Sequence, residues 1–156
     1  MEATLLERIK EQLVRHEGLR LKPYRCTAGK LTIGIGRNLD DCGISQTEAY
    51  VLLENDIQNC EKQLLDEIPE IYSALDEVRK SVLLNMCFNL GIGGLLEFNN
   101  TLAFIAAGDW ERAATELLTR GEITVTYPHH PGIIPVSYYV MTGDDTGMMP
   151  LRYSPD

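Results

Sequence analysis

The spacing of apolar side chains predicts a helix at the start of the chain. Over residues 4–16 these side chains recur three or four positions apart, and Gly18 follows as a C-terminal stop. The apolar positions are Leu5, Ile9, Leu13 and Val14. Such a stripe is the face with which an amphipathic helix packs against its neighbours.

Residues 19–44 change to a β-type pattern. Pro23 and several glycines interrupt short runs of β-branched and aromatic residues, which indicates strands at residues 24–26 and 31–35 joined by a turn at residues 27–30. A β element of two or three strands is marginal alone, so we expect it to pack on a helix.

Helical spacing returns after residue 44. A capping box at residues 45–48 opens a long helix that ends before Pro69. Its apolar face comprises Leu52, Leu53, Ile57, Cys60, Leu64 and Leu65. We expect this face to be buried along the helix.

The most hydrophobic helix is predicted over residues 73–90, and we interpret it as a central buried element. Shorter helices follow over residues 100–107 and from Asp109 onward. The break after the central helix is assigned to Gly91, Gly93 and Gly94.

The helical pattern ends at Gly121. Five of the seven prolines lie beyond it, and that density excludes a long helix. Residues 124–127 and 136–140 are candidate short strands. We expect the last thirty residues to be irregular and comparatively mobile.

Length and charge narrow the class of protein. A chain of 156 residues can form one domain, or two lobes that share a long helix. The net charge of −9 argues against a nucleic-acid partner, since phosphate binding needs clustered Lys and Arg. No apolar run approaches the roughly 20 residues that span a bilayer, and the start lacks the pattern of a secretory signal. We therefore expect a cytoplasmic product without membrane insertion.

The four cysteines, Cys26, Cys42, Cys60 and Cys87, lack the CxxC spacing of a zinc site. We therefore expect no metal and, without export, reduced thiols. Cys60 and Cys87 fall on apolar helix faces and are interpreted as core residues. A bridge between Cys26 and Cys42 is an open alternative, because both residues flank the predicted sheet.

Six basic residues make the first forty positions comparatively basic around Glu17, although the chain as a whole is acidic. They are Arg15, Arg20, Lys22, Arg25, Lys30 and Arg37. We interpret them first as a solvated rim, which is the usual role of such a run.

Glu17 and Thr32 are the candidate catalytic residues that the pattern itself offers. Gly18 lets the chain turn directly after Glu17, and apolar neighbours would partly desolvate the carboxyl so that it keeps a proton near neutrality. Thr32 lies on a strand in which Gly34 and Gly36 allow close approach by another backbone or by sugar rings. Taken alone, each residue has an ordinary alternative, a surface carboxylate or a β-strand threonine.

Eight residues separate Glu17 from Cys26, and five separate Cys26 from Thr32. This frame resembles the active-site lobe of phage-type (T4-like) lysozymes, glycoside hydrolase family 24. That family has Glu, Asp and Thr at the same spacing, and its Thr lies inside a Thr-Ile-Gly-x-Gly strand. The resemblance extends over about residues 5–120, including an Asn-Met-x-Phe-Asn-x-Gly helix end. That helix end is residues 85–91, and the further matching segments are residues 98–101 and 108–114.

The resemblance implies an α+β, mainly helical, lysozyme-like fold in a single domain of residues 1–156. A small β-containing N-terminal lobe (about residues 15–60) and a helical C-terminal lobe (about residues 61–120, plus the N-terminal helix) would be joined by the long helix, with an atypical Pro-rich tail at residues 121–156. The implied reaction is hydrolysis of peptidoglycan at the β-1,4 bond between N-acetylmuramic acid and N-acetylglucosamine. Such hydrolysis needs no metal or organic cofactor.

The resemblance also implies residue roles. Glu17 matches the general acid that protonates the leaving oxygen, and Thr32 matches the residue that helps to hold the attacking water. The implied substrate-binding positions are Gly36, Asn38, Phe88, Asn89 and Thr101.

Cys26 stands where the family commonly has Asp. A thiolate can supply the missing negative charge, since Arg25, Lys22 or Lys30 would lower the pKa of the thiol from about 8.5. Electrostatic or water-positioning help is favoured over nucleophilic attack on the anomeric carbon. The remaining alternative is an inert Cys26.

Two further features concern charge near the candidate acid. The nearest spare carboxylates, Asp40 and Asp41, lie in a predicted loop and are interpreted as turn and cap residues. The family usually ends with an Arg-rich helical stretch, and an Arg from that stretch commonly pairs with the catalytic Glu. This chain lacks that stretch. Only residues 139–143 look like that ending.

Two alternative functions are kept beside the muramidase. A lytic transglycosylase also uses one essential Glu, which suits a chain that has Cys26 in place of a second carboxylate. A cell-wall-binding module that has lost turnover is the other. For the leading hypothesis we expect a monomer whose partners are peptidoglycan glycan strands and a holin-like release partner.

Overall fold

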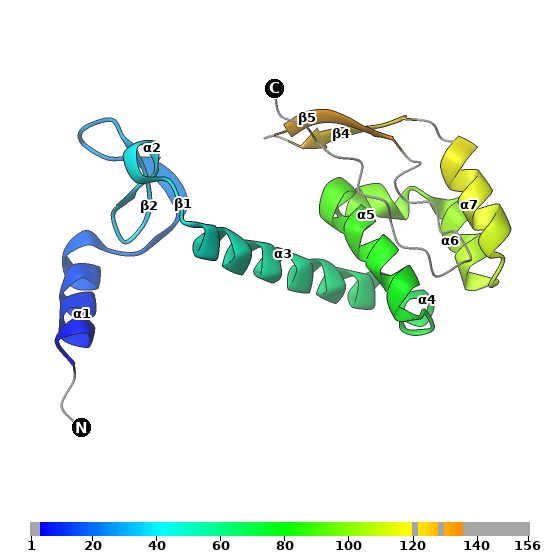
Figure 1. The fold of residues 1–156 in the computed structure, drawn as a ribbon, viewed down its shortest axis with the longest axis horizontal. Helices are drawn as coiled ribbons and strands as arrows, with labels where there is room; N and C mark the ends of the chain where they lie inside the picture. The colour runs from blue at the N-terminus through cyan, green and yellow to red at the C-terminus, as the bar shows by residue number, and fades with distance from the viewer. Residues whose placement is uncertain (1–3, 120–121, 128–129, 136–156) are drawn as a thin grey trace. The chain divides into compact units, whose positions relative to one another are not determined.

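The computed structural model describes residues 4–119, 122–127 and 130–135 (Figure 1). The chain forms two compact units, Met1–Leu52 and Leu53–Asp156. Each unit has its own elements, and the long helix α3 begins in the first and continues into the second.

The first unit opens with α1, Leu5–Glu17, as the apolar spacing predicts. Thr4 and Glu7 form a capping box at its start, and Gly18, with φ of 72°, ends it by donating its N–H to the Val14 carbonyl. No residue of α1 is buried in the part of the chain that the structure describes. The predicted apolar stripe, Leu5, Ile9, Leu13 and Val14, is therefore exposed.

Three short strands follow in a single antiparallel sheet of order β1-β2-β3. They are β1 (Arg20–Arg25), β2 (Leu31–Gly34) and β3 (Arg37–Asn38), and a short helix α2 (Leu39–Cys42) comes next. Thr32 pairs with Tyr24 on one side and with Asn38 on the other. Because residues in register share a face of a sheet, these three side chains leave it on the same side.

The long helix α3, Gln46–Glu67, begins at the predicted capping box. The Glu48 N–H donates to Ser45 Oγ at 3.2 Å, and the Ser45 N–H donates to Glu48 Oε2 at 2.7 Å. Only Cys60 and Leu64 are buried along α3, because its C-terminal half alone meets the core of the second unit. The rest of the predicted apolar face, Leu52, Leu53, Ile57 and Leu65, is exposed.

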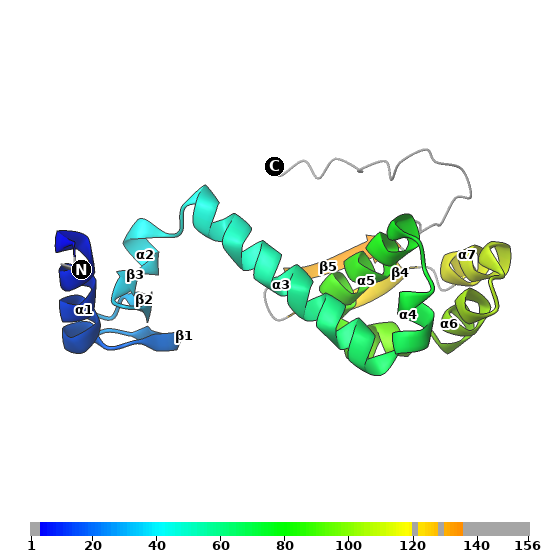
Figure 2. The same cartoon turned by 90° about the horizontal axis from the view of Figure 1, so that it is seen from below.

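The second unit is a helical core built around α5, Glu77–Leu96. Around it are α4 (Pro69–Ser73), α6 (Asn99–Ala106) and α7 (Trp110–Thr119), and Figure 2 shows α6 and α7 side by side. Cys60 and Cys87 lie in this core, which confirms their interpretation as core residues.

The central helix differs from its prediction at both ends. It begins at Glu77 rather than residue 73, because the Asp76 carboxylate accepts the Arg79 N–H at 2.8 Å and caps it. The glycine break is a kink at Gly91 alone, where φ is 72° and ψ is 161°, after which the helix resumes to Leu96.

Beyond α7, β4 (Glu122–Tyr127) and β5 (His130–Pro135) form a second, two-stranded antiparallel sheet. The predicted strand at residues 124–127 lies within β4, whereas the candidate strand at residues 136–140 falls outside the described residues. The expectation that the last thirty residues are irregular is wrong for β5. Both strands are edges, where proline is tolerated because its missing N–H faces away from the ladder.

The fold class is α+β and mainly helical with a small sheet, as the sequence predicts. No single helix among the described residues is both long and apolar enough to cross a membrane. Only α5 and α6 pass that test together, as a pair bent by 102°.

Candidate active site

The Glu17 carboxylate lies against the turn between β2 and β3. A Cβ atom built on Gly36 would stand 3.4 Å from Glu17 Oε2 and 3.6 Å from Glu17 Cγ. Gly36 also has φ of 74°, a backbone conformation that residues other than glycine rarely adopt. The Glu17 side chain therefore rests in van der Waals contact with this turn, whose positive φ favours glycine.

Glu17 is exposed, so the partial desolvation expected from the sequence is not found. Gly18, the next residue in the sequence, and Gly36, against which the carboxylate lies, have no side chains with which to cover it. Within the described part of the chain Glu17 takes part in no ion pair.

Cys26 begins the turn that joins β1 to β2. Its N–H donates to the Lys30 carbonyl at 3.0 Å, and its own carbonyl accepts the Gly29 N–H at 2.8 Å. These two hydrogen bonds fold residues 26–30 into a tight loop. The Cys26 side chain is half-buried beside that loop.

The pKa of the Cys26 thiol is lowered, chiefly because the Ala28 N–H, and next the Lys30 N–H, hydrogen-bond to the sulfur. The Thr32 hydroxyl adds a smaller contribution in the same direction. The direction agrees with the sequence prediction, but its cause does not. Backbone donors stabilise the thiolate, as they stabilise anions in other turns, and no cationic side chain contributes.

The cationic side chains that were expected to act on Cys26 are engaged elsewhere or point to solvent. Lys30 Nζ lies 2.7 Å from Asp41 Oδ1, and Arg25 Nη1 donates to the Gly29 carbonyl at 2.8 Å. Sequence analysis missed the backbone donors, although the turn-forming residues directly after Cys26 are their signal.

Thr32 is buried in the middle of β2, with 3% of its surface exposed. Its hydroxyl donates to the Lys30 carbonyl at 3.0 Å, and the same Thr32 hydroxyl also contacts the Cys26 sulfur. The structure therefore brings two of the three predicted catalytic residues, Cys26 and Thr32, into contact across the β1–β2 turn.

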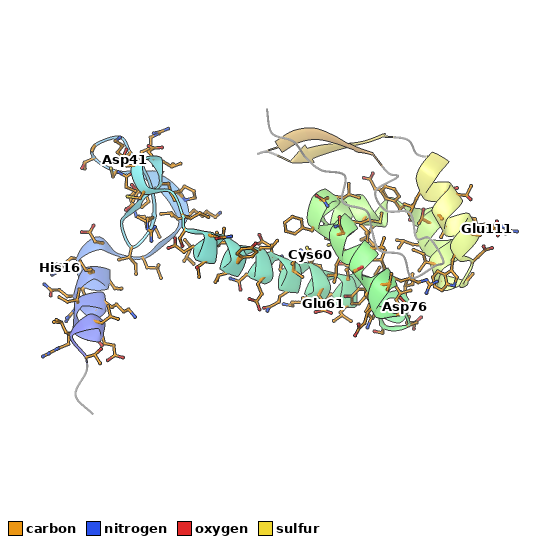
Figure 3. The ribbon with its side chains drawn as sticks, viewed as in Figure 1. His16, Asp41, Cys60, Glu61, Asp76 and Glu111 are labelled. Carbon is orange, nitrogen blue, oxygen red and sulfur yellow. The ribbon has the colours of Figure 1, made fainter. Side chains whose placement is uncertain are left out.

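Asp40 and Asp41 lie in the first turn of α2 rather than in the predicted loop, and Asn38 rather than either of them caps that helix. Asp40 Oδ2 accepts the Leu31 N–H at 2.8 Å, at the start of β2. Asp41, which Figure 3 labels on α2, accepts from Lys30 Nζ through Oδ1 and from Asn38 Nδ2 through Oδ2, at 2.7 and 2.8 Å. Both carboxylates are thus occupied in holding β2, β3 and α2 together.

Asn38, a predicted substrate-binding residue, caps α2. Its side-chain oxygen accepts the Asp41 N–H at 3.1 Å, while its Nδ2 donates to the Asp41 carboxylate. Its position beside Thr32 in the sheet agrees with a place in the site. A contact with substrate stays a prediction.

The other predicted substrate-binding residues belong to the second unit. Phe88 is exposed on α5, and Asn89 is held by hydrogen bonds from its Nδ2 to Asn85 O and Oδ1, at 2.9 and 2.8 Å. Thr101 is only 1% exposed, and its hydroxyl is buried without a hydrogen-bond partner among the described residues. Its burial gives a ligand no direct access, so its role stays a prediction.

Metal chemistry and thiol pairing can be examined in the described residues. No group of three or more His, Cys, Asp or Glu side chains there could hold a metal ion. All four cysteines are free, so the open alternative of a Cys26–Cys42 bridge is not formed.

A family comparison covers every candidate site residue. The sequence model of the family described as Phage lysozyme matches residues 14–125, which is more than half of the chain. That span begins within α1, includes the whole β1-β2-β3 sheet and ends within β4.

The chain is also similar to several curated proteins. It is 32% identical over 130 residues to the pre-baseplate central spike protein Gp5 of Enterobacteria phage T4, which covers 66% of this chain and 23% of that protein. It is 28% identical over 141 residues to the probable T4-type lysozyme 1 of Dictyostelium discoideum, covering 72% of this chain and 83% of the relative. The endolysin of Acyrthosiphon pisum secondary endosymbiont phage 1 is 29% identical over 126 residues, or 77% of this chain and 83% of the relative.

Proposed function

Because the chain belongs to the phage lysozyme family, whose members are muramidase-type glycoside hydrolases of peptidoglycan, we propose that it cleaves the β-1,4 bond between N-acetylmuramic acid and N-acetylglucosamine with Glu17 as general acid. The observation that carries this assignment is the position of the Glu17 carboxylate against Gly36. The strand β2, with Thr32 at its centre, separates that contact from the turn that holds Cys26.

In the proposed reaction, Glu17 gives its proton to the glycosidic oxygen as the bond from that oxygen to the anomeric carbon breaks. The bonding electron pair leaves with the oxygen, and positive charge develops on the sugar ring. A water molecule then adds to the anomeric carbon and releases a proton. Negative charge near the ring lowers the energy of this transition state.

Cys26 is the proposed source of that negative charge. Backbone N–H donors favour its thiolate, which can stand in for a carboxylate and accept a hydrogen bond from the attacking water. Thr32 would fix the orientation of the sulfur, which its hydroxyl contacts, and through the sulfur that of the water.

Replacement of the proton donor tests the assignment. Glu17→Gln removes the acidic proton while keeping the size of the side chain, and we expect it to abolish the loss of turbidity of bacterial cells. Thermal unfolding should be unchanged, because the Glu17 side chain is exposed. Lysis at the parent's rate by this variant would eliminate the proposal.

A lytic transglycosylase is the second candidate, and one observation favours keeping it. Asp40 and Asp41, the nearest spare carboxylates in sequence, are both engaged in the sheet, which leaves Glu17 to act without a second carboxylate from that loop. Product mass separates the two reactions. A hydrolase yields reducing ends that contain the added water, whereas a transglycosylase yields internal anhydro rings that lack it.

We further propose that the enzyme works as a monomer and reaches the wall from the cytoplasm with the help of a membrane-permeabilising, holin-like partner. The substrate lies outside the cytoplasmic membrane, so an enzyme made inside must be released. Expression in the cytoplasm should leave cells intact until the membrane is permeabilised, and sedimentation should give the mass of one chain. Lysis without permeabilisation would contradict the release step.

A further inference from the structure

The basic run around Glu17 separates into two classes in the structure. Two of its six cations are neutralised, since Lys30 pairs with Asp41 and Arg37 pairs with Glu48, each at 2.7 Å. The other four have no acidic partner among the described residues. They are Arg15, Arg20, Lys22 and Arg25, which we term the basic strip.

The contacts made by the basic strip orient its side chains without removing their charge. Arg15 Nε donates to the Glu11 carbonyl at 3.3 Å, and the Arg20 guanidinium lies over the Tyr24 ring at 4.3 Å. Arg25 Nη1 donates to the Gly29 carbonyl at 2.8 Å. All four side chains are exposed, so their charge is available to a partner.

Charge is distributed unevenly between this strip and the rest of the chain. Residues 15–25 contain four cations and one carboxylate, Glu17, whereas the whole chain has a net charge of −9. An anionic polymer is therefore repelled by the molecule in general and attracted at the basic strip. Such a distribution orients an anionic substrate rather than merely increasing its affinity.

The basic strip also lies next to the proposed acid along the chain and across the sheet. Arg20 follows Glu17 by three residues and pairs with Gly34. Gly34 is two residues before Gly36, against which the Glu17 carboxylate rests.

We propose that the basic strip binds the carboxylates of the peptide stems of peptidoglycan, an inference that rests on the proposed function. The stems are attached to the lactyl group of muramic acid, so their carboxylates are the anions that accompany the sugar at the scissile bond. Guanidinium groups are suited to carboxylates because they can donate two parallel hydrogen bonds. Phosphodiester polymers of the wall are attached elsewhere and fit this position less well.

A binding measurement in the Glu17→Gln background tests the proposal without turnover. The probe is purified sacculi that lack phosphodiester polymers, either untreated or with their carboxyl groups converted to amides. Lys22→Glu reverses an exposed charge that makes no ion pair among the described residues. We expect it to weaken binding to untreated sacculi by about three- to tenfold at low salt, and to have no effect on amidated sacculi.

Lys62→Glu is the matched control, because it makes the same charge change at an exposed position of α3 outside the basic strip. It should leave binding within about twofold of the parent, as expected for a charge that makes no contact with the ligand. Equal losses in the two variants would overturn the proposal in favour of net charge. Unchanged binding by Lys22→Glu would overturn it as well.

Two further arms decide the source of the anion and separate this inference from the proposed function. If the Lys22→Glu loss persists on amidated sacculi that carry phosphodiester polymers, the strip recognises phosphate and the proposal is wrong. If Glu17→Gln abolishes lysis while Lys22→Glu binds normally, only the strip proposal fails. If Glu17→Gln still lyses cells while Lys22→Glu binds weakly, the catalytic assignment fails and the strip remains.

Discussion

At the scale of single residues, Cys26 offers a direct test, because backbone donors rather than a cation lower the pKa of its thiol. Alkylation by iodoacetamide follows the thiolate fraction. We therefore expect the rate at Cys26 to reach half its maximum below pH 8.5, the approximate pKa of a free cysteine. Peptide mass mapping of a pH series measures this. A midpoint at or above the free value would contradict the backbone contacts.

The same residue can be tested by activity. Cys26→Ser removes the ionisable group, and we expect the lysis rate to fall by about 10- to 100-fold, the scale of a lost electrostatic contribution in a transition state. Cys26→Asp restores a negative charge and should keep most of the rate. The ratio of the two rates under identical conditions is the measurement. If the serine variant lyses cells as fast as the parent, thiol chemistry has no part in catalysis.

The sequence was enough to propose which residues form the site, but not which groups surround each of them. The spacing of Glu17, Cys26 and Thr32 can be recognised in the sequence, whereas the loop predicted for Asp40 and Asp41 is the short helix α2. The turn-forming residues after Cys26 signal a tight loop, but not which of its N–H groups meet the sulfur. The contacts of those N–H groups with Cys26, and of Glu17 with the Gly36 turn, became visible only in three dimensions.

At the scale of elements, the β2–β3 turn is predicted to position the acid. Gly36→Ala places a methyl group 3.4 Å from Glu17 Oε2 at a φ of 74°. We expect a loss of about 1–2 kcal/mol in the free energy of unfolding from the left-handed backbone. A fall in lysis rate should accompany it, because relief of the backbone strain shifts the turn against which the carboxylate rests.

Gly43→Ala is the control for backbone strain alone. Gly43 has φ of 56°, but no atom lies within 4 Å of the position of its added Cβ. It should lose a similar amount of stability in denaturant titrations while keeping most of its lysis rate at a temperature where both variants are folded. Equal rates in the two variants would show that Gly36 does not position Glu17.

The start of a helix was predictable where the sequence contains a capping box with both of its partners. Ser45 and Glu48 begin α3 at the expected position, since both reciprocal hydrogen bonds form. The start of α5 was missed because the apolar pattern extends back to Leu75, whereas the helix begins only after its N-cap, Asp76. Periodicity reports which face is apolar, whereas caps report where the helix begins.

At the scale of the whole molecule, apolar patterning predicted more burial than is observed. The core consists of side chains from α3 through α7, as the hydrophobic pattern of those helices indicates. The stripe of α1 is equally regular in sequence but is exposed. A periodic stripe specifies a helix face, and the sequence does not specify what covers it.

The helical core also carries a prediction of alkaline instability. Tyr72 is 1% exposed and donates to Glu61 Oε1 at 3.1 Å, and burial followed by this hydrogen bond raises its pKa from 10.0 to about 12. Between these values the unfolded chain loses the tyrosine proton while the folded chain keeps it. The unfolded state then binds fewer protons, so the free energy of unfolding falls as pH rises, by up to about 1.4 kcal/mol per pH unit.

Tyr72→Phe removes this titration. We expect the variant to be less stable than the parent at pH 8 by about 1 kcal/mol, because it lacks the hydrogen bond to Glu61. At pH 11 the difference should shrink or reverse, since only the parent loses stability through Tyr72. Guanidinium unfolding of both proteins at the two pH values measures it, and other groups that titrate in this range, such as Cys87, are common to both. A constant difference between parent and variant would mean that Tyr72 ionises as readily in the folded core as in the unfolded chain.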